Sequence, residues 1–124
     1  MQIAICDDEK SIGLILEEKI KKLLPDAVID KYLSGDELIA SGCEPDILFL
    51  DIQMPVMDGY KATVAMRNLE VEDPHRRRAV IVGMSANAFR EDVDKALSLG
   101  MDDYITKPID VKELSRVLNK YCKV

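Results

Sequence analysis

Short apolar runs alternate with amphipathic segments along the whole chain. The apolar runs that are short enough for strands cover residues 2–6, 47–50 and 79–84, and residues 27–32 and 104–106 are also expected to form strands. Two of them, 47–50 and 79–84, contain no polar residue, which is typical of strands buried on both faces of a parallel sheet. The pattern therefore predicts a parallel sheet at the centre of the fold.

Between these runs, apolar residues recur at spacings of three and four, which predicts helices. The expected helices cover residues 10–24, 34–39, 59–69, 89–99 and a last segment from 110 onward, and residues 70–78 are expected to form a charged loop. Regular alternation of strand and helix predicts an α/β domain with helices on both faces of the sheet. No linker or repeat interrupts it, so we expect residues 1–124 to form a single domain.

Composition narrows the possible functions. The chain has 124 residues, 17 basic and 23 acidic, and a net charge of −6, which disfavours direct binding to nucleic acid. No apolar run approaches the roughly 20 residues of a membrane span, so no membrane association is expected. The three cysteines are far apart and form no CxxC motif, which argues against a disulfide framework or a zinc site and favours a cytoplasmic location.

Polar residues stand where four of the five predicted strands end. Asp7 and Asp8 follow the first strand, Asp51 the third, Ser85 the fourth and Lys107 the fifth. The carboxyl ends of parallel strands share one edge of a sheet, so these side chains should converge. Three crowded carboxylates repel one another unless a cation lies among them, and oxygen ligands without His or Cys suit Mg²⁺. Because a carboxylate can also act as a nucleophile, the residues predict a Mg²⁺-dependent phosphoryl acceptor centred on aspartate.

Four segments, 6–9 (CDDE), 50–59 (LDIQMPVMDG), 84–87 (MSAN) and 103–108 (DYITKP), together resemble the receiver (REC) domain of two-component response regulators. The resemblance spans essentially the whole chain in family order. It implies a flavodoxin-like (βα)5 three-layer sandwich with a five-stranded parallel sheet in the order 2-1-3-4-5. The N-terminal half resembles receivers of LytTR-type regulators, whereas 85–104 resembles receivers of hybrid sensor kinases.

The resemblance implies a role for the three aspartates, for Lys107 and for Gln53. Asp51 matches the phosphoacceptor. Asp8 matches the direct Mg²⁺ ligand, and Asp7 its partner, which often acts through water. Gln53 occupies the position whose backbone carbonyl binds the metal. Lys107 matches the lysine that pairs with the phosphoryl oxygens.

The resemblance also implies a conformational switch. Ser85 matches the hydroxyl that is drawn toward the phosphoryl group, and Tyr104 the aromatic residue that changes rotamer in response. Pro108 matches a proline that follows a cis peptide bond, which would direct Lys107 into the site. Gln53 and Asn87 occupy positions that tune dephosphorylation in receivers.

The implied function is a phosphoacceptor switch that promotes its own phosphorylation and dephosphorylation but is not otherwise an enzyme. A sensor histidine kinase or a histidine phosphotransfer domain would supply the phosphoryl group. The fourth helix, fifth strand and fifth helix would signal to an output domain or downstream protein, with the chain as a monomer or a phosphorylation-dependent dimer.

Three alternatives compete with this interpretation. A haloacid-dehalogenase type phosphatase would need a second Asp two residues after Asp51, where Gln53 stands. A flavin carrier would need a phosphate-binding loop after the first strand, where Asp7 and Asp8 would repel phosphate. A degenerate receiver that acts only through protein contacts would not need the complete set of acids, hydroxyl and lysine.

Overall fold

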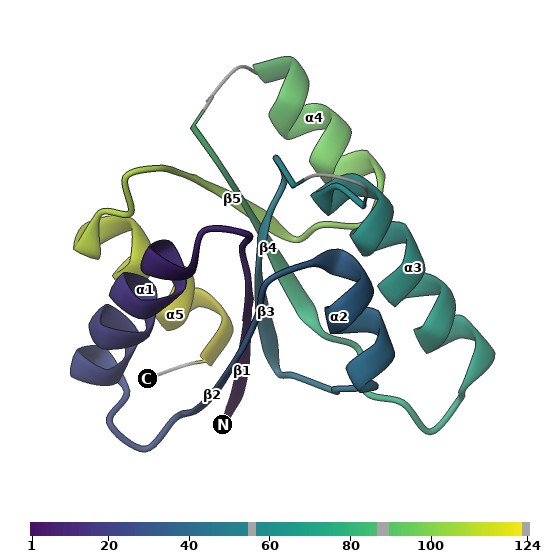
Figure 1. Ribbon diagram of the computed structural model, residues 1–124, viewed down its shortest axis with the longest axis horizontal. Coiled ribbons are helices and arrows are strands. Elements are labelled where there is room, and N and C mark those ends of the chain that lie inside the picture. The colour runs from purple at the N-terminus through teal and green to yellow at the C-terminus, as the bar shows by residue number, and fades with distance from the viewer. Residues whose placement is uncertain (55–56, 87–89, 123–124) are drawn as a thin grey trace.

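The computed structural model describes residues 1–54, 57–86 and 90–122, and within these ranges five strands alternate with five helices (Figure 1). The strands are β1 (Gln2–Cys6), β2 (Val28–Tyr32), β3 (Ile47–Asp51), β4 (Val80–Ser85) and β5 (Asp103–Thr106). The helices are α1 (Lys10–Leu23), α2 (Gly35–Ser41), α3 (Gly59–Glu72), α4 (Arg90–Ser98) and α5 (Val111–Cys122).

All strand pairs are parallel, and the sheet order is β2-β1-β3-β4-β5. Helices α1 and α5 cover one face, and α2, α3 and α4 lie on the other side of the sheet (Figure 1). This arrangement confirms the predicted three-layer sandwich and its strand order. No helix of the described part of the chain is long and apolar enough to cross a membrane.

The central strand β3 explains why the sequence shows no alternation there. Ile47 and Phe49 pack in the core shared with α1 and α5, whereas Leu48 and Leu50 pack in the core shared with α2 and α3. Neighbouring side chains of a strand point to opposite faces, so a strand covered on both faces needs apolar residues throughout.

Helix α3 continues to Glu72, so the prediction that it ends at residue 69 and that residues 70–78 form a loop was wrong for the last turn. Arg67 Nη1 donates to both carboxylate oxygens of Glu70, at 2.8 and 3.1 Å, and Glu70 Oε2 accepts from the backbone N–H of Ala79 at 2.7 Å. These contacts of Glu70 stabilise the last turn of α3, although its charged residues are typical of a loop. The predicted start of the fourth helix at Phe89 lies outside the described residues.

Candidate functional site

Three aspartates meet at the carboxyl edge of the sheet. Strands β1 and β3 are neighbours, and Cys6 pairs with Leu50, so the chain continues into Asp7 and Asp51 side by side. One carboxylate oxygen from each of Asp7, Asp8 and Asp51 lies within 4.8 Å of the others. Asp7 and Asp51 are each only 2% exposed, whereas Asp8 is exposed. Two of the three carboxylates are therefore buried, and solvent reaches the cluster at Asp8.

The two buried carboxylates are oriented by their own loops. The backbone N–H of Glu9 donates to Asp7 Oδ1 at 2.9 Å, and that of Gln53 donates to Asp51 Oδ1 at 3.0 Å. Such bonds to the residue two positions ahead are typical of aspartates that begin turns. Each carboxylate is thus held by the turn that follows its strand, before any ligand binds.

Lys107 brings one positive charge to the aspartates. Its backbone N–H donates to the carbonyl of Ser85 at 2.8 Å, and the peptide bond to Pro108 is cis. Its Nζ lies 2.8 Å from Asp7 Oδ2 and 3.4 Å from Asp51 Oδ1. The side chain of Lys107 is 16% exposed, so the ion pairs form largely away from water.

Burial and neighbouring charges shift the pKa values of Asp51 and Lys107. Burial raises the pKa of Asp51 to about 6; the charge of Asp7 acts in the same direction, while the N–H of Gln53 and the charge of Lys107 oppose it. Burial alone would lower the pKa of Lys107, but its contacts with Asp7 and Asp51 outweigh that effect and the pKa lies above its ordinary value. The ammonium therefore stays charged, and the carboxylates still outnumber it.

The donor atoms fit a hard cation. Asp7 Oδ2 is buried, and among the described residues it accepts no hydrogen bond of suitable geometry, although Lys107 Nζ is close to it. Aspartate oxygens form this cluster without any His or Cys ligand, and one of them is exposed to solvent. Mg²⁺ prefers carboxylate oxygens and keeps several waters, so the cluster suits Mg²⁺ better than Zn²⁺. The exposed Gln53 follows Asp51 at the same edge.

The residues expected to switch lie on the α4 side of the acids. Ser85 ends β4 and is 3% exposed, and Tyr104 lies in β5 and is half-buried. Both line a pocket of about 290 Å³ between β4, β5 and the starts of α3 and α4. The structure thus places the hydroxyl and the aromatic ring around one open space beside the acids. Asn87 lies outside the described residues.

Sequence reasoning missed Tyr60, which lines the same pocket. Its hydroxyl is 3.5 Å from the carbonyl of Asp92 in α4, to which it donates, and Lys95 Nζ lies 4.5 Å from its ring centroid. Burial raises the pKa of this phenol. A tyrosine in the first turn of a helix has no distinctive spacing, so only the packing of α3 against α4 reveals this contact.

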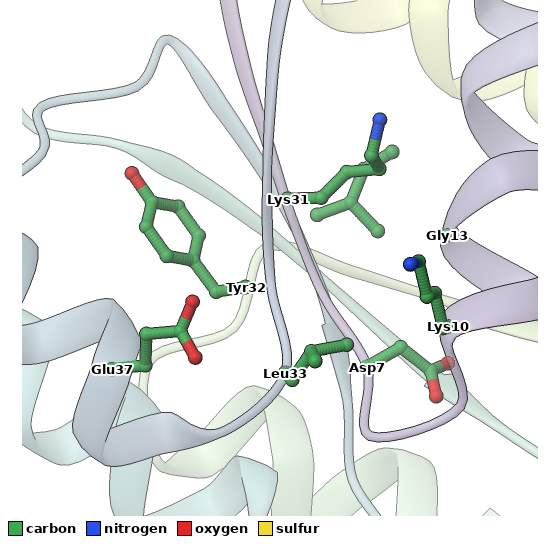
Figure 2. Close-up of a pocket in the computed structure, with 8 residues that line it drawn as sticks. Asp7, Lys10, Gly13, Lys31, Tyr32, Leu33 and Glu37 are labelled. Carbon is green, nitrogen blue, oxygen red and sulfur yellow. The ribbon is translucent and has the colours of Figure 1, made fainter.

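A second pocket, of about 200 Å³, lies on the α1 side of the acids (Figure 2). It extends from Lys10 and Gly13 of α1, across the end of β2, to Glu37 of α2. Asp7 forms part of its lining, so the acidic edge is bordered by open space on this side as well.

A family model described as "Response regulator receiver domain" matches residues 3–119. The chain is 35% identical over 123 residues to hybrid signal transduction histidine kinase G of Dictyostelium discoideum, an alignment that covers 98% of this chain and 4% of that protein. It is 38% identical over 122 residues to sensor histidine kinase GacS of Pseudomonas protegens, covering 94% and 13%. The chain thus spans only a small part of these curated relatives.

Solved structures of other proteins are similar along nearly the whole chain. The receiver domain of sensor histidine kinase PA1611 from Pseudomonas aeruginosa, with a magnesium ion coordinated in its active site cleft, has a TM-score of 0.81 at 27% identity, covering 99% of this chain and 98% of that one. The receiver domain of Ssk1, crystallised with the histidine phosphotransfer protein Ypd1 from Saccharomyces cerevisiae, has a TM-score of 0.88 at 24% identity, covering 98% and 88%. The latter likeness shows the fold.

Proposed function

The chain belongs to the response regulator receiver domain family, and on that premise we propose that it is a phosphoacceptor switch of two-component signal transduction. A sensor histidine kinase or a histidine phosphotransfer domain donates a phosphoryl group to Asp51 in a Mg²⁺-dependent reaction. One observation carries this proposal: separate strand ends bring three carboxylates and one ammonium within a few ångströms of one another.

The chemistry follows from these positions. A carboxylate oxygen of Asp51 attacks the phosphorus of a phosphohistidine, a P–O bond forms, and the P–N bond breaks with its electron pair going to the imidazole nitrogen. Lys107 binds the phosphoryl oxygens. Asp7, Asp8, Asp51 and the backbone carbonyl of Gln53 hold Mg²⁺, which neutralises charge on the transferred group. The protein contributes mainly position and charge.

The phosphoryl group then alters the balance of charge at the site. It adds about −1.5 to −2 units of charge and new acceptor oxygens, to which Ser85 and Lys107 can donate. The hydroxyl of Ser85 closes on the phosphoryl group, and Tyr104 moves inward, into the space beside Ser85. Both residues line the pocket of about 290 Å³, which supports this sequence of events. The changed surface formed by α4, β5 and α5 signals to an output domain or downstream protein.

The chain acts as a signalling module rather than as an enzyme with turnover on a separate substrate. The exposed amide of Gln53 stands two residues after Asp51, where a phosphatase of this chemistry needs a titratable acid. Gln53 and Asn87 tune the dephosphorylation of Asp51. A single family match over residues 3–119 supports one receiver domain over 1–124, and the widely spaced cysteines support a cytoplasmic location.

Labelling by a small phosphodonor tests the proposal. Incubation with acetyl phosphate and Mg²⁺ should add the mass of one phosphoryl group, and Asp51→Asn should abolish the gain. Asp58→Asn is the matched control, because Asp58 caps α3 by accepting from the N–H of Lys61 and asparagine caps equally well. Labelling that persists in Asp51→Asn would place the phosphoacceptor elsewhere and overturn the proposal.

A further inference from the structure

Lys19 of helix α1 contacts the loop that carries Lys107. Lys19 Nζ donates to the backbone carbonyl of Ile109, at 2.6 Å, across 90 positions of sequence. Ile109 is two residues beyond Lys107 and only 6% exposed. We propose that Lys19 is a positioning residue for phosphoryl transfer, which fixes the loop so that Lys107 reaches the acids; the inference rests on the proposed function.

The backbone of the segment from Lys107 to Ile109 is hydrogen-bonded at both of its ends. At its start, the N–H of Lys107 donates to the carbonyl of Ser85 in β4. Pro108 has no N–H with which to make a further bond. At its end, the carbonyl of Ile109 accepts from Lys19. The sheet therefore holds one end of this segment, and α1 holds the other.

The bond from Lys19 joins the two halves of the site. Helix α1 begins at Lys10, directly after the acidic turn of Asp7 and Asp8, and the loop after β5 carries the ammonium. Lys107 Nζ lies 2.8 Å from Asp7 Oδ2 and 3.4 Å from Asp51 Oδ1, so a small shift of the loop would change both contacts. Misplacement of a reacting or charge-stabilising group by about 1 Å can slow a reaction by orders of magnitude.

The same helix offers a matched comparison. Lys21 Nζ donates to the carbonyl of Ala27, also at 2.6 Å, and that carbonyl lies just before β2, at the opposite edge of the sheet from the acids. Lys19 and Lys21 thus make the same kind of bond from one helix, but only Lys19 holds the loop that carries Lys107.

The test compares rates of phosphorylation by acetyl phosphate in the presence of Mg²⁺, followed by intact mass. Lys19→Met keeps the side-chain stem and the helix propensity but removes the donor, and should slow labelling of Asp51 roughly ten-fold. Lys19→Arg, which retains donors, should keep most of the rate, and Lys21→Met should keep all of it. Mg²⁺ affinity, measured by calorimetry, should not weaken in Lys19→Met, because the acids keep their own turns.

A double-mutant cycle separates positioning from general loosening. If Lys19 acts through Lys107, adding Lys19→Met to Lys107→Ala should not slow labelling further, measured over a longer incubation. An equal loss in that background, a similar loss in Lys21→Met, or a parallel loss of Mg²⁺ affinity would overturn the inference. Should Lys19→Met not fold, as judged by circular dichroism, Lys19→Ala carries the same comparisons.

The two proposals fail in different ways. If the wild-type chain takes up no phosphoryl group, the proposed function is wrong. If the wild type is labelled at Asp51 and Lys19→Met is labelled at the same rate, only the positioning role of Lys19 is wrong.

Discussion

Removing the ammonium of Lys107 from the acidic cluster should destabilise the protein, and Mg²⁺ should reverse part of that loss. Asp7 and Asp51 are each 2% exposed beside Lys107, so Lys107→Met leaves two buried carboxylates without the cation that pairs with them. Burying a carboxylate without a partner is unfavourable, because the protein interior screens its charge poorly. The same change also removes a competitor of Mg²⁺ for these oxygens.

The expected loss of stability follows from the burial of Lys107, Asp7 and Asp51. Breaking a buried ion pair by removing one partner costs about 3–5 kcal/mol. The side chain of Lys107 is 16% exposed and Asp51 can take up a proton, so the free energy of unfolding should fall by the smaller amount of about 2–3 kcal/mol without metal. A ligand at 100 times its dissociation constant stabilises the native state by about 2.7 kcal/mol. Because Lys107→Met lacks the competing ammonium, it should bind Mg²⁺ more tightly than the wild type does, so excess Mg²⁺ should narrow the difference in stability between the two proteins.

The assay is urea unfolding at pH 7, followed by circular dichroism, in EDTA and in excess Mg²⁺. Lys31→Met is the matched control, because Lys31 Nζ lies 2.7 Å from Glu17 Oε1 but the two side chains are 34% and 28% exposed. The free energy of unfolding of Lys31→Met should fall by less than about 1 kcal/mol, and this decrease should not depend on Mg²⁺.

Two results would refute the reasoning. One is a loss of stability in EDTA no larger for Lys107→Met than for Lys31→Met. The other is a gap between Lys107→Met and the wild type that stays the same when Mg²⁺ is added, which would mean that the ammonium and the metal do not share the carboxylates.

Three further predictions test other parts of the structure. Burial raises the pKa of Asp51 from its ordinary value of 3.8 to about 6, so the metal-free native state binds the proton more tightly than the unfolded chain does. The stability from this group should therefore be lost as pH rises through that interval. Asp51→Asn should lack this slope and be more stable than the wild type at pH 7 in urea titrations; a parallel pH profile would contradict this. Gly59→Ala would place its Cβ 2.6 Å from the carbonyl oxygen of Asp51, so thermal unfolding should show a loss of about 1–3 kcal/mol. Gly13→Ala, whose Cβ would meet only a lysine stem at 3.5 Å, should gain about 0.5–1 kcal/mol; losses of equal size in the two variants would count against the packing argument. Arg67→Met leaves Glu70 and Asp102 without their shared guanidinium and should cost about 3 kcal/mol in urea unfolding without changing the labelling of Asp51. Stability equal to that of the wild type would show that this network contributes little.

Much of the fold could be predicted from local pattern. The wholly apolar run 47–50 predicted a strand covered on both faces, and the structure buries it against helices on each side. The residues that follow the apolar runs predicted which side chains share one edge of the sheet. The order of the strands came from the resemblance to a family, because periodicity reports which residues are buried but not which strands are neighbours.

The errors and omissions concern contacts between distant segments. The last turn of α3 depends on Glu70 meeting Arg67 and the N–H of Ala79, and no property of residues 70–72 by themselves reveals it. The bond from Lys19 to Ile109 joins positions far apart in the sequence. In the sequence, Lys19 does not differ from the other polar residues of an amphipathic helix, so its pattern does not predict the bond.

The sequence by itself determined where the strands run and which acids, hydroxyl and lysine stand at their ends, because side-chain alternation and residue type are local properties. Only the tertiary structure decided that Lys107 lies closer to Asp7 than to Asp51, and that α1 holds the loop behind it. Those distances depend on how separately folded segments pack against one sheet, and close packing of side chains from many positions sets them together.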